Sequence, residues 1–406
     1  MNKLIAILIL FAICSGQTLA QSRTGIGTTT PIGKLHISGV NGEPALVVES
    51  NFTPPQVYNQ PLLKLRQNGA DVLWLNADVN TNILMGLSTG SSLLPTAQSN
   101  MFLGHLSGNK NTDGGLNIGL GQGSIANSTS GDNNIAIGFY SLSGGTSSFN
   151  NVAVGNYAMS ASGGSDNVSV GFSARRLGTG SYNTAVGTNA LYNTTDAQYN
   201  TALGYRAGTS YNNGFNNVFV GANTDVTAAG RFNVIAIGQA TVVNANSTAR
   251  FGNSATTSYG GYAGWTNISD GRFKRNIRED VPGLSFITQL KPVTYNIAAA
   301  ELDAFLHPHN KNEMDAAAKA FYAKALQEKE NIKYSGFIAQ DVEASAKALG
   351  FDFSGVDKPK TADDTYGLRY AEFVVPLVKA VQEQQEMIRQ LQKEIEELKI
   401  TMKDKR

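Results

Sequence analysis

Residues 134–171 read NIAIGFYSLSGGTSSFNNVAVGNYAMSASGGSDNVSVG and contain three copies of one short motif. The motif is Asn, any residue, a small residue, an aliphatic residue and Gly, and it recurs at Asn134–Gly138, Asn151–Gly155, Asn167–Gly171, Asn183–Gly187, Asn200–Gly204 and Asn217–Gly221. A seventh copy, Asn233–Gly238, carries one extra residue. From Gly104 to Gly238, glycines at this phase are spaced by 16 or 17 residues, a period that predicts stacked coils over residues 99–258.

The content of one repeat favours a β-solenoid over a helical repeat. Three residues such as Ile135–Ile137 suffice for a short strand, and the following Gly lets the backbone turn. A small residue recurs three positions later, as at Ser141 and Ala158. The motif Asn can bond its own backbone at a bend or stack in a ladder with the Asn of the next coil. A helix pair does not fit this period, and each Gly would cost a helix about 1 kcal/mol.

Each coil has too few large apolar side chains to close a core alone. Three solenoids that share an axis would bury the aliphatic positions between them. The repeats also resemble the heads of trimeric autotransporter adhesins, and this resemblance implies a homotrimer. A monomeric solenoid with a narrow core remains the alternative. Tyrosines such as Tyr182 and Tyr199 are scattered on the variable arcs and would suit a surface glycan or a protein ligand, without defining one groove.

The N-terminus predicts an exported protein. Residues 1–20 form a signal peptide, with Lys3, an apolar run Leu4–Ile13 and a small-residue end before Gln21. Cys14 is the only cysteine and lies inside this peptide, so the mature chain has no disulfide and no thiolate metal site. No later stretch is apolar enough to span a membrane, and we expect the protein to be secreted or held at the cell surface. Residues 21–98 alternate apolar and polar positions, which predicts short strands and turns.

Charge divides the chain into two parts. Of 32 basic and 31 acidic residues, only 11 and 9 lie before residue 269. The net charge of +1 offers no basic face for nucleic acid. The aspartates of the repeats stand singly, which argues against a metal site, and no cofactor motif is present. The histidine-containing stretch 307–310 is interpreted as a solvated turn.

The C-terminal part is predicted to be α+β. After a neck at residues 259–268, residues 284–297 suggest a helix or loop and then a strand, residues 315–330 a helix, and residues 334–349 a strand and a helix. The last helix carries a heptad that predicts a coiled coil over residues 374–402, with core positions Val374, Leu377, Val381, Gln384, Ile388, Leu391, Ile395, Leu398 and Met402. The core residues alone would favour two strands rather than three.

Four ordered motifs in residues 269–406 carry a resemblance: SDGRFKRNI, LKPVTYNI, GFIAQDVE and YGLRYAEFVVPLVKAVQEQQ. Together they resemble the intramolecular chaperone domain of phage endosialidases and tail spikes, the peptidase S74 family. The resemblance implies a domain that assists folding and trimerisation of the fibre and then cuts itself off. It makes Ser269 the nucleophile, Lys274 the dyad lysine and Ile268-Ser269 the scissile bond. Residues 301–331 look like an insertion relative to the family.

The chemistry at this boundary places conditions on the structure. A serine hydroxyl needs a base, and a neutral lysine serves as one if burial lowers its pKa. Residues five apart do not share a face of a strand or a helix, so the segment must bend, and Gly271 would permit the bend. Asp270 and Arg272 would orient the bend or pair with each other. No turnover on an external substrate is indicated.

Two classes of function follow. The first is an exported trimeric fibre, adhesive or structural, whose C-terminal chaperone domain autocleaves once. The second is a trimeric fibre resembling a tail spike that binds or degrades glycans and carries the same chaperone. A deep acidic cleft would favour the second, and a thin featureless shaft the first.

Overall fold

The computed structural model describes residues 24–26, 35–37, 63–67, 70–77, 81–161, 163–210, 213–307 and 316–404. The predicted signal peptide and Cys14 lie outside these residues. Within the predicted β-rich region 21–98, β1 (Thr24–Ile26) pairs in parallel with β2 (Leu35–Ile37), and β3 (Leu63–Gln67) pairs antiparallel with β4 (Ala70–Ala77).

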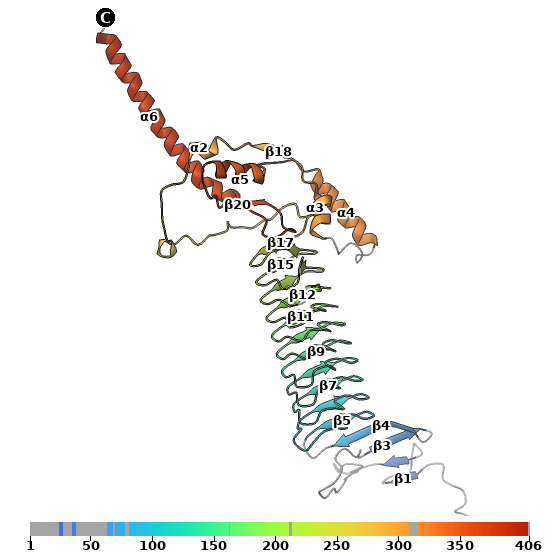
Figure 1. Cartoon of the computed structure of the whole chain (residues 1–406). Coiled ribbons are helices and arrows are strands. Elements are labelled where there is room, and N and C mark those ends of the chain that lie inside the picture. Colours follow the sequence, from blue (N-terminus) through green and yellow to red (C-terminus); the bar gives the residue numbers. More distant parts are fainter. Residues whose placement is uncertain are drawn as a thin grey trace, which may run out of the picture.

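A β-solenoid of about ten turns occupies residues 83–251, as the repeat predicts. One three-residue strand per turn lies in parallel register on the next (Figure 1): β5 (Ile83–Met85), β6 (Met101–Leu103), β7 (Ile118–Leu120), β8 (Ile135–Ile137), β9 (Val152–Val154), β10 (Val168–Val170), β11 (Thr184–Val186), β12 (Thr201–Leu203), β13 (Val218–Val220), β15 (Ile235–Ile237) and β17 (Ala249–Phe251). A second, shorter pair joins β14 (Asp225–Val226) to β16 (Val242–Val243). The first coil therefore begins at Ile83, before the expected residue 99.

The motif Asn residues form a buried ladder along the solenoid. The Oδ1 atom of Asn134 accepts bonds from the backbone N and from Nδ2 of Asn151, both at 3.1 Å, and its Nδ2 donates to the backbone O of Ser148 at 2.8 Å. The side chain thus satisfies backbone groups that the bend would leave unpaired. The ladder ends at Val234, whose backbone N donates to Asn217 Oδ1. The seventh copy therefore has Val in the ladder position, and the extra residue inferred from Asn233 is not an insertion.

The motif glycines hold the turn at each strand end. Gly138 has φ of +132°, and a Cβ there would lie 2.6 Å from the carbonyl group of Gly155 in the next coil. A side chain is excluded both by the backbone conformation and by this close stacking. The small residue three positions later is buried in every coil, as at Ser141 and Ala158.

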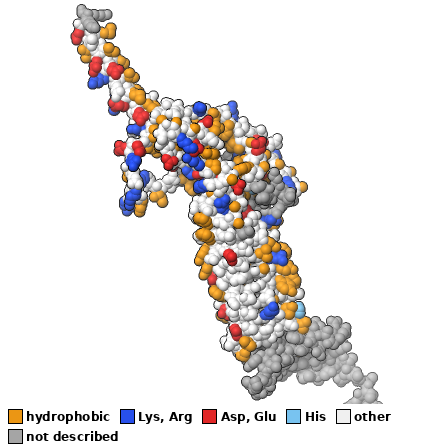
Figure 2. Space-filling view, viewed as in Figure 1, with side chains coloured by type: hydrophobic (Ala, Val, Ile, Leu, Met, Phe, Trp, Pro, Cys, Tyr) orange, Lys and Arg blue, Asp and Glu red, His pale blue; other side chains and the backbone are white. Residues whose placement is uncertain are grey.

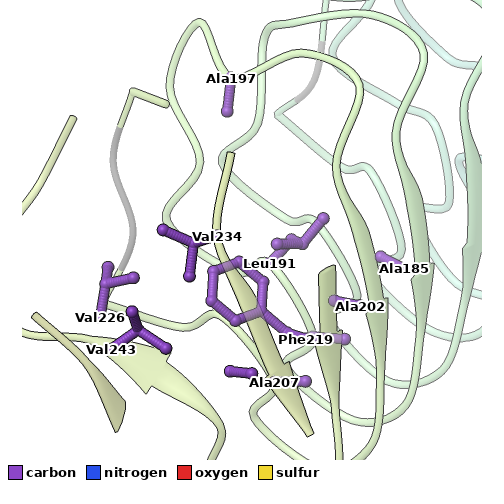
Figure 3. Close-up of a cluster of buried hydrophobic side chains, with 11 residues drawn as sticks. Ala185, Leu191, Ala197, Ala202, Ala207, Phe219, Val226, Val234 and Val243 are labelled. Atoms are coloured by element: carbon purple, nitrogen blue, oxygen red, sulfur yellow. The ribbon is translucent and has the colours of Figure 1, made fainter. Parts of the chain in front are cut away.

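The core inside the coils is narrow and built mainly from the middle residue of each strand. Most of these residues are small, such as Ala136 and Ala153, and larger ones sit where glycines leave room. Phe102 fills the space over Gly108 and Gly119, so that a Cβ on either glycine would meet its ring. Figure 3 shows the corresponding cluster near the C-terminal end, where Phe219 and Leu191 lie among small side chains.

The outer side of the strands remains aliphatic and uncovered in the single chain. The first and third strand residues point away from the core, and the exposed ones are Ile83, Met85, Met101, Ile137, Val168, Leu203, Ile235 and Phe251. Charged side chains are sparse on the shaft and gather over the C-terminal region (Figure 2). We call the outward strand residues the aliphatic stripe.

The C-terminal region is α+β, as predicted. The elements predicted within residues 284–297, 315–330 and 334–349 and the last helix are present, whereas the helix Ala299–Leu306 and the strands Val356–Asp357 and Gly367–Leu368 were not predicted. The region contains α2 (Leu284–Ile287), β18 (Val293–Tyr295), α3 (Ala299–Leu306), α4 (Ala316–Glu330), β19 (Tyr334–Gly336), α5 (Ala339–Ala348), β20 (Val356–Asp357), β21 (Gly367–Leu368) and α6 (Val374–Asp404). Strand β18 pairs antiparallel with β19, and β20 with β21. A small core of Phe286, Val342, Ala346, Phe353, Val356 and Phe373 ties these elements together.

Helix α6 extends away from this core (Figure 1). Its base packs against α2, where the Glu383 carboxylate accepts a bond from Leu284 N at 2.7 Å. Beyond that point the heptad residues Ile388, Leu391 and Ile395 are between 41% and 56% exposed. A helix with this unpaired apolar seam requires partner helices. Among the described residues, no helix is both long and apolar enough to cross a membrane.

Candidate functional site

The predicted serine and lysine lie together at the boundary between the shaft and the C-terminal region. Lys274 Nζ donates a hydrogen bond to Ser269 Oγ at 2.8 Å. This is the separation at which an amine can exchange a proton with a hydroxyl. Ser269 carries the nitrogen of the predicted scissile amide, and the neighbouring Ile268 is 94% exposed.

A single 3₁₀ turn, η1 (Gly271–Phe273), brings the two side chains together. The Asp270 carboxylate caps the turn by accepting a bond from Arg272 N at 2.9 Å, and Lys274 N donates to Gly271 O at 3.2 Å. The turn reverses the chain between Ser269 and Lys274, so residues five apart meet on one side. The bend that the chemistry requires is therefore present.

Asp270 and Arg272, which were expected either to orient the bend or to pair with each other, form an ion pair. Arg272 Nε and Nη2 donate to Asp270 Oδ2 at 2.9 and 2.6 Å. The hydrogen bonds from Arg272 lower the pKa of Asp270 and keep it ionised, which maintains the cap. The pair therefore acts on the shape of the turn. Their side-chain hydrogen bonds join Asp270 to Arg272 and do not involve the hydroxyl of Ser269.

The expectation that the bend depends on the backbone freedom of Gly271 was wrong. Gly271 does not have the positive φ that only glycine adopts easily, and a Cβ there would meet no atom within 4 Å. The turn is held by the Asp270 cap rather than by glycine flexibility. A residue with positive φ does occur further along, at Asn276.

The dyad is exposed in the isolated chain. Ser269 and Lys274 are both exposed to solvent, and so are residues 259–268 of the neck. A lysine accepts a proton only as the neutral amine, and burial is what favours that form. The single chain brings the two side chains together but does not bury them.

A family comparison adds to this geometry. The C-terminal domain matches the Peptidase_S74 family. The family model, described as chaperone of endosialidase, covers residues 269–351 and begins at Ser269 itself. Comparison with curated proteins gives no match. A Peptidase_S74 domain behind a β-solenoid fits a tail-fibre-like protein that carries its own chaperone. The catalytic roles of Ser269 and Lys274 stay predictions.

The Peptidase_S74 domain also contacts the shaft through residues that the sequence did not indicate. His307 was interpreted as part of a solvated turn, but it ends α3, is 8% exposed and bonds to Ala240 in the solenoid. Its partners lie 4 and 67 residues away, and the second separation is invisible to any motif. Residues 301–331, expected to be an insertion, therefore contact the end of the solenoid, as do residues 361–364.

Proposed function

We propose that this protein is an exported, trimeric, adhesive or structural fibre whose Peptidase_S74 domain assists folding and assembly and then cleaves once at Ile268-Ser269. The observation that carries the proposal is the contact between Lys274 Nζ and Ser269 Oγ at the first residue of the family match. The contact lies between a sparsely charged shaft and a highly charged domain with an unpaired coiled-coil seam.

Two exposed apolar surfaces, one along the shaft and one along α6, support the trimer. The aliphatic stripe runs along the whole outer side of the main sheet, and a contiguous apolar surface of this length marks an interface. The exposed seam of α6 requires parallel partner helices. Three copies around one axis would bury both features at once, and that shared solution favours a homotrimer over the two-stranded preference of the heptad alone.

The cleavage step uses groups of this chain alone. Lys274 Nζ takes the proton from Ser269 Oγ, which attacks the carbonyl carbon of Ile268. The bond from that carbon to the Ser269 nitrogen breaks, the nitrogen takes the proton back from the Lys274 ammonium and becomes a primary amine, and an ester joins Ile268 to Ser269 Oγ. Water then hydrolyses the ester and leaves a carboxylate on Ile268 and the hydroxyl on Ser269. The reaction consumes its own bond, so it occurs once per chain.

Assembly supplies the condition that the isolated chain lacks. Because the neutral amine is favoured by burial, neighbouring copies that cover Lys274 would activate the dyad after the trimer forms. Cleavage would then follow folding, and removal of the folding aid would leave the shaft kinetically stable.

The test is the mass of the purified wild-type chain beside the Ser269→Ala variant. We expect wild type to give two fragments, the second beginning at Ser269, and Ser269→Ala to stay at full length. Full-length wild type in a sample that forms trimers would contradict the proposal.

Glycan binding on the shaft is the second candidate. Tyr182 and Tyr199 stack with ring centroids 4.9 Å apart, and Phe215 stacks on Phe232 at 5.2 Å, so these aromatics do share a face. A groove of about 360 Å³ lies beside Tyr199 and Phe215 and is lined by a single carboxylate, Asp196. Aromatic faces suit sugar rings, whereas glycoside hydrolysis needs two carboxylates, so binding is favoured over degradation. Loss of binding to an oligosaccharide panel in Tyr199→Ala would support it, and an unchanged or absent signal would not.

A further inference from the structure

Helices α3 and α4 overlap the expected insertion at residues 301–331 and contact the end of the solenoid. Figure 1 shows α3 and α4 beside the β17 end of the shaft. Ser254, just after β17, bonds through Oγ to Asp303 Oδ1 at 2.5 Å and to the Tyr322 hydroxyl at 3.0 Å. Lys329 Nζ donates to Thr256 O at 2.8 Å. We call Asp303, His307, Tyr322 and Lys329 the docking cluster.

His307 is the member of the docking cluster whose protonation matters most. Its Nδ1 lies 2.9 Å from Asp303 Oδ1 and 3.1 Å from Asp303 O, and its Nε2 lies 2.9 Å from Ala240 O. All three partners are oxygen acceptors without a hydrogen to give. A neutral imidazole has one N–H and can satisfy only one side, whereas the imidazolium has two. The bond from His307 to the solenoid, together with the bond to Asp303, therefore requires the charged ring.

The surrounding charges favour that form on balance. Burial would lower the pKa of His307, but its hydrogen bonds with Asp303 and Ala240 outweigh burial and raise the pKa above the ordinary 6.5. Burial would likewise raise the pKa of Asp303, but the bonds from His307, Ser254 and Tyr322 lower it.

Lys329 and Arg250 line the same cavity as His307, between the last coil and α3, and their positive charges disfavour a further positive charge on His307. Lys329 donates to Thr256 O, and its pKa is lowered by burial. Arg250 pairs with Asp364 at 3.3 Å. The phenols that face the cavity and the cluster, Tyr259 and Tyr322, bond to Phe251 O and Asp303, respectively. Asp303 is therefore the carboxylate that directly balances His307.

The contact combines polar bonds with loose packing. A cavity of about 940 Å³ separates the last coil from α3 and is lined by residues of β17, the neck and α3, many of them apolar, such as Phe251, Trp265 and Leu302. On the other side, Asn244 Nδ2 donates to Asp363 O at 2.9 Å. Lasting interfaces are close-packed, whereas poorly packed ones are typical of partners that separate. The domain is thus held at the end of the shaft by a limited set of polar bonds beside an unfilled cavity, and such contacts can be reversed.

We propose that the insertion is a docking surface whose partner is the last coil of the shaft, and that protonated His307 keeps the domain seated there until deprotonation releases it. The proposal builds on the proposed function, because release matters only once the covalent link is cut. The pKa of His307 is raised in the docked state. Its contribution to docking is therefore complete below about pH 6.5 and is lost as the pH rises through the raised value.

The test does not need autocleavage. In the Ser269→Ala background, a recognition sequence for an added protease replaces residues 266–268 of the exposed neck, and the shaft carries an N-terminal tag. After the added protease cuts, the fraction of the C-terminal fragment retained on the tagged shaft is measured at pH 6 and pH 9. We expect retention at pH 6 to exceed that at pH 9 at least tenfold.

Variants assign the effect to one residue. His307→Asn is expected to lower retention at pH 6 to the level at pH 9, while His105→Asn on the shaft should leave the wild-type profile unchanged. Equal wild-type retention at both values, or a pH dependence that survives in His307→Asn, would overturn the proposal. If His307→Asn does not assemble, histidine C2-hydrogen exchange in the uncut chain decides the matter. The pKa of His307 must then exceed the ordinary 6.5, and a lower value would refute the latch. Failure of autocleavage would leave all of these measurements readable.

Discussion

Lys274 Nζ lies 2.8 Å from Ser269 Oγ because a capped 3₁₀ turn folds back the four residues between them. The geometry of the dyad is local and survives in a single chain, while both side chains remain exposed. Geometry and activation are therefore separate properties here. The turn supplies the first, and we propose that assembly through α6 and the aliphatic stripe supplies the second.

Breaking the coiled-coil seam should prevent assembly and cleavage together. Leu391→Asp places a charge at a core position that is exposed in the single chain and buried among partner helices. In the Ser269→Ala background, the molar mass measured by light scattering should fall from that of three chains to that of one. In the wild-type background, the cleaved fraction should fall at least tenfold.

Gln390→Asp, which lies outside the seam, is the matched control and should assemble and cleave normally. Full cleavage in a monomeric Leu391→Asp chain would show that the dyad needs no neighbouring copy.

The Asn ladder should matter more for stability than similar bonds on the surface. Asn151→Ala removes a buried amide that donates to Gly164 O at 3.0 Å and accepts from Asn167 N at 3.0 Å. An unsatisfied buried backbone group costs about 1–3 kcal/mol, so the denaturation midpoint should fall accordingly. Asn156→Ala also loses a bond between coils, to Phe139 N, but this residue is exposed and water can replace the bond. Equal losses in the two variants would argue against the ladder.

The motif glycines should tolerate no side chain. Gly138→Ala would place a methyl group 2.6 Å from the backbone of Gly155 at a φ of +132°. Strained backbone of this kind costs about 1–3 kcal/mol, and three copies per trimer would multiply the effect. Gly163→Ala, where nothing lies within 4 Å of the new atom, should be nearly silent in thermal unfolding. A stable Gly138→Ala fibre would mean that the coils can separate there.

Asp225 should make the solenoid more stable in mild acid. Burial raises the pKa of its carboxyl from 3.8 to about 6, despite hydrogen bonds from Val226 N and Ser210 N. Because the folded pKa is raised, the contribution is complete below pH 3.8 and is lost as the pH rises through about 6, a change on the order of 3 kcal/mol.

Unfolding in the Ser269→Ala background at pH 4.5 and pH 8 measures this effect. Asp225→Asn should lose the extra stability in acid. Asp132→Asn, at an exposed aspartate that accepts a bond from Gly115 N, should retain it. If Asp225→Asn keeps the wild-type pH dependence, the buried carboxyl is not its source.

The sequence predicted the parts of the fold that repeat or alternate. The coils, the ladder and most helices of the C-terminal domain follow from local patterns, because each involves neighbours along the chain or at a fixed period. The first coil was missed because Leu84 replaces the small middle residue, as Phe102 does in the second coil. Large residues fit there only because glycines such as Gly119 face them from adjacent coils.

Other features depend on contacts that no sequence pattern carries. The dyad was foreseen from a resemblance, and the need for a bend from its spacing, but the cap at Asp270 rather than Gly271 forms the turn. The docking cluster joins Ser254 to Asp303 and Tyr322, residues 49 and 68 positions further on. Such pairs are set by how two domains pack.

The most direct test of self-release is the intact mass of Lys274→Ala purified beside wild type and Ser269→Ala. The account predicts that wild type separates into fragments ending at Ile268 and beginning at Ser269, and that both variants form trimers of uncut chains. Cleavage at Ile268-Ser269 in Lys274→Ala, at the wild-type rate, would contradict the Ser-Lys mechanism.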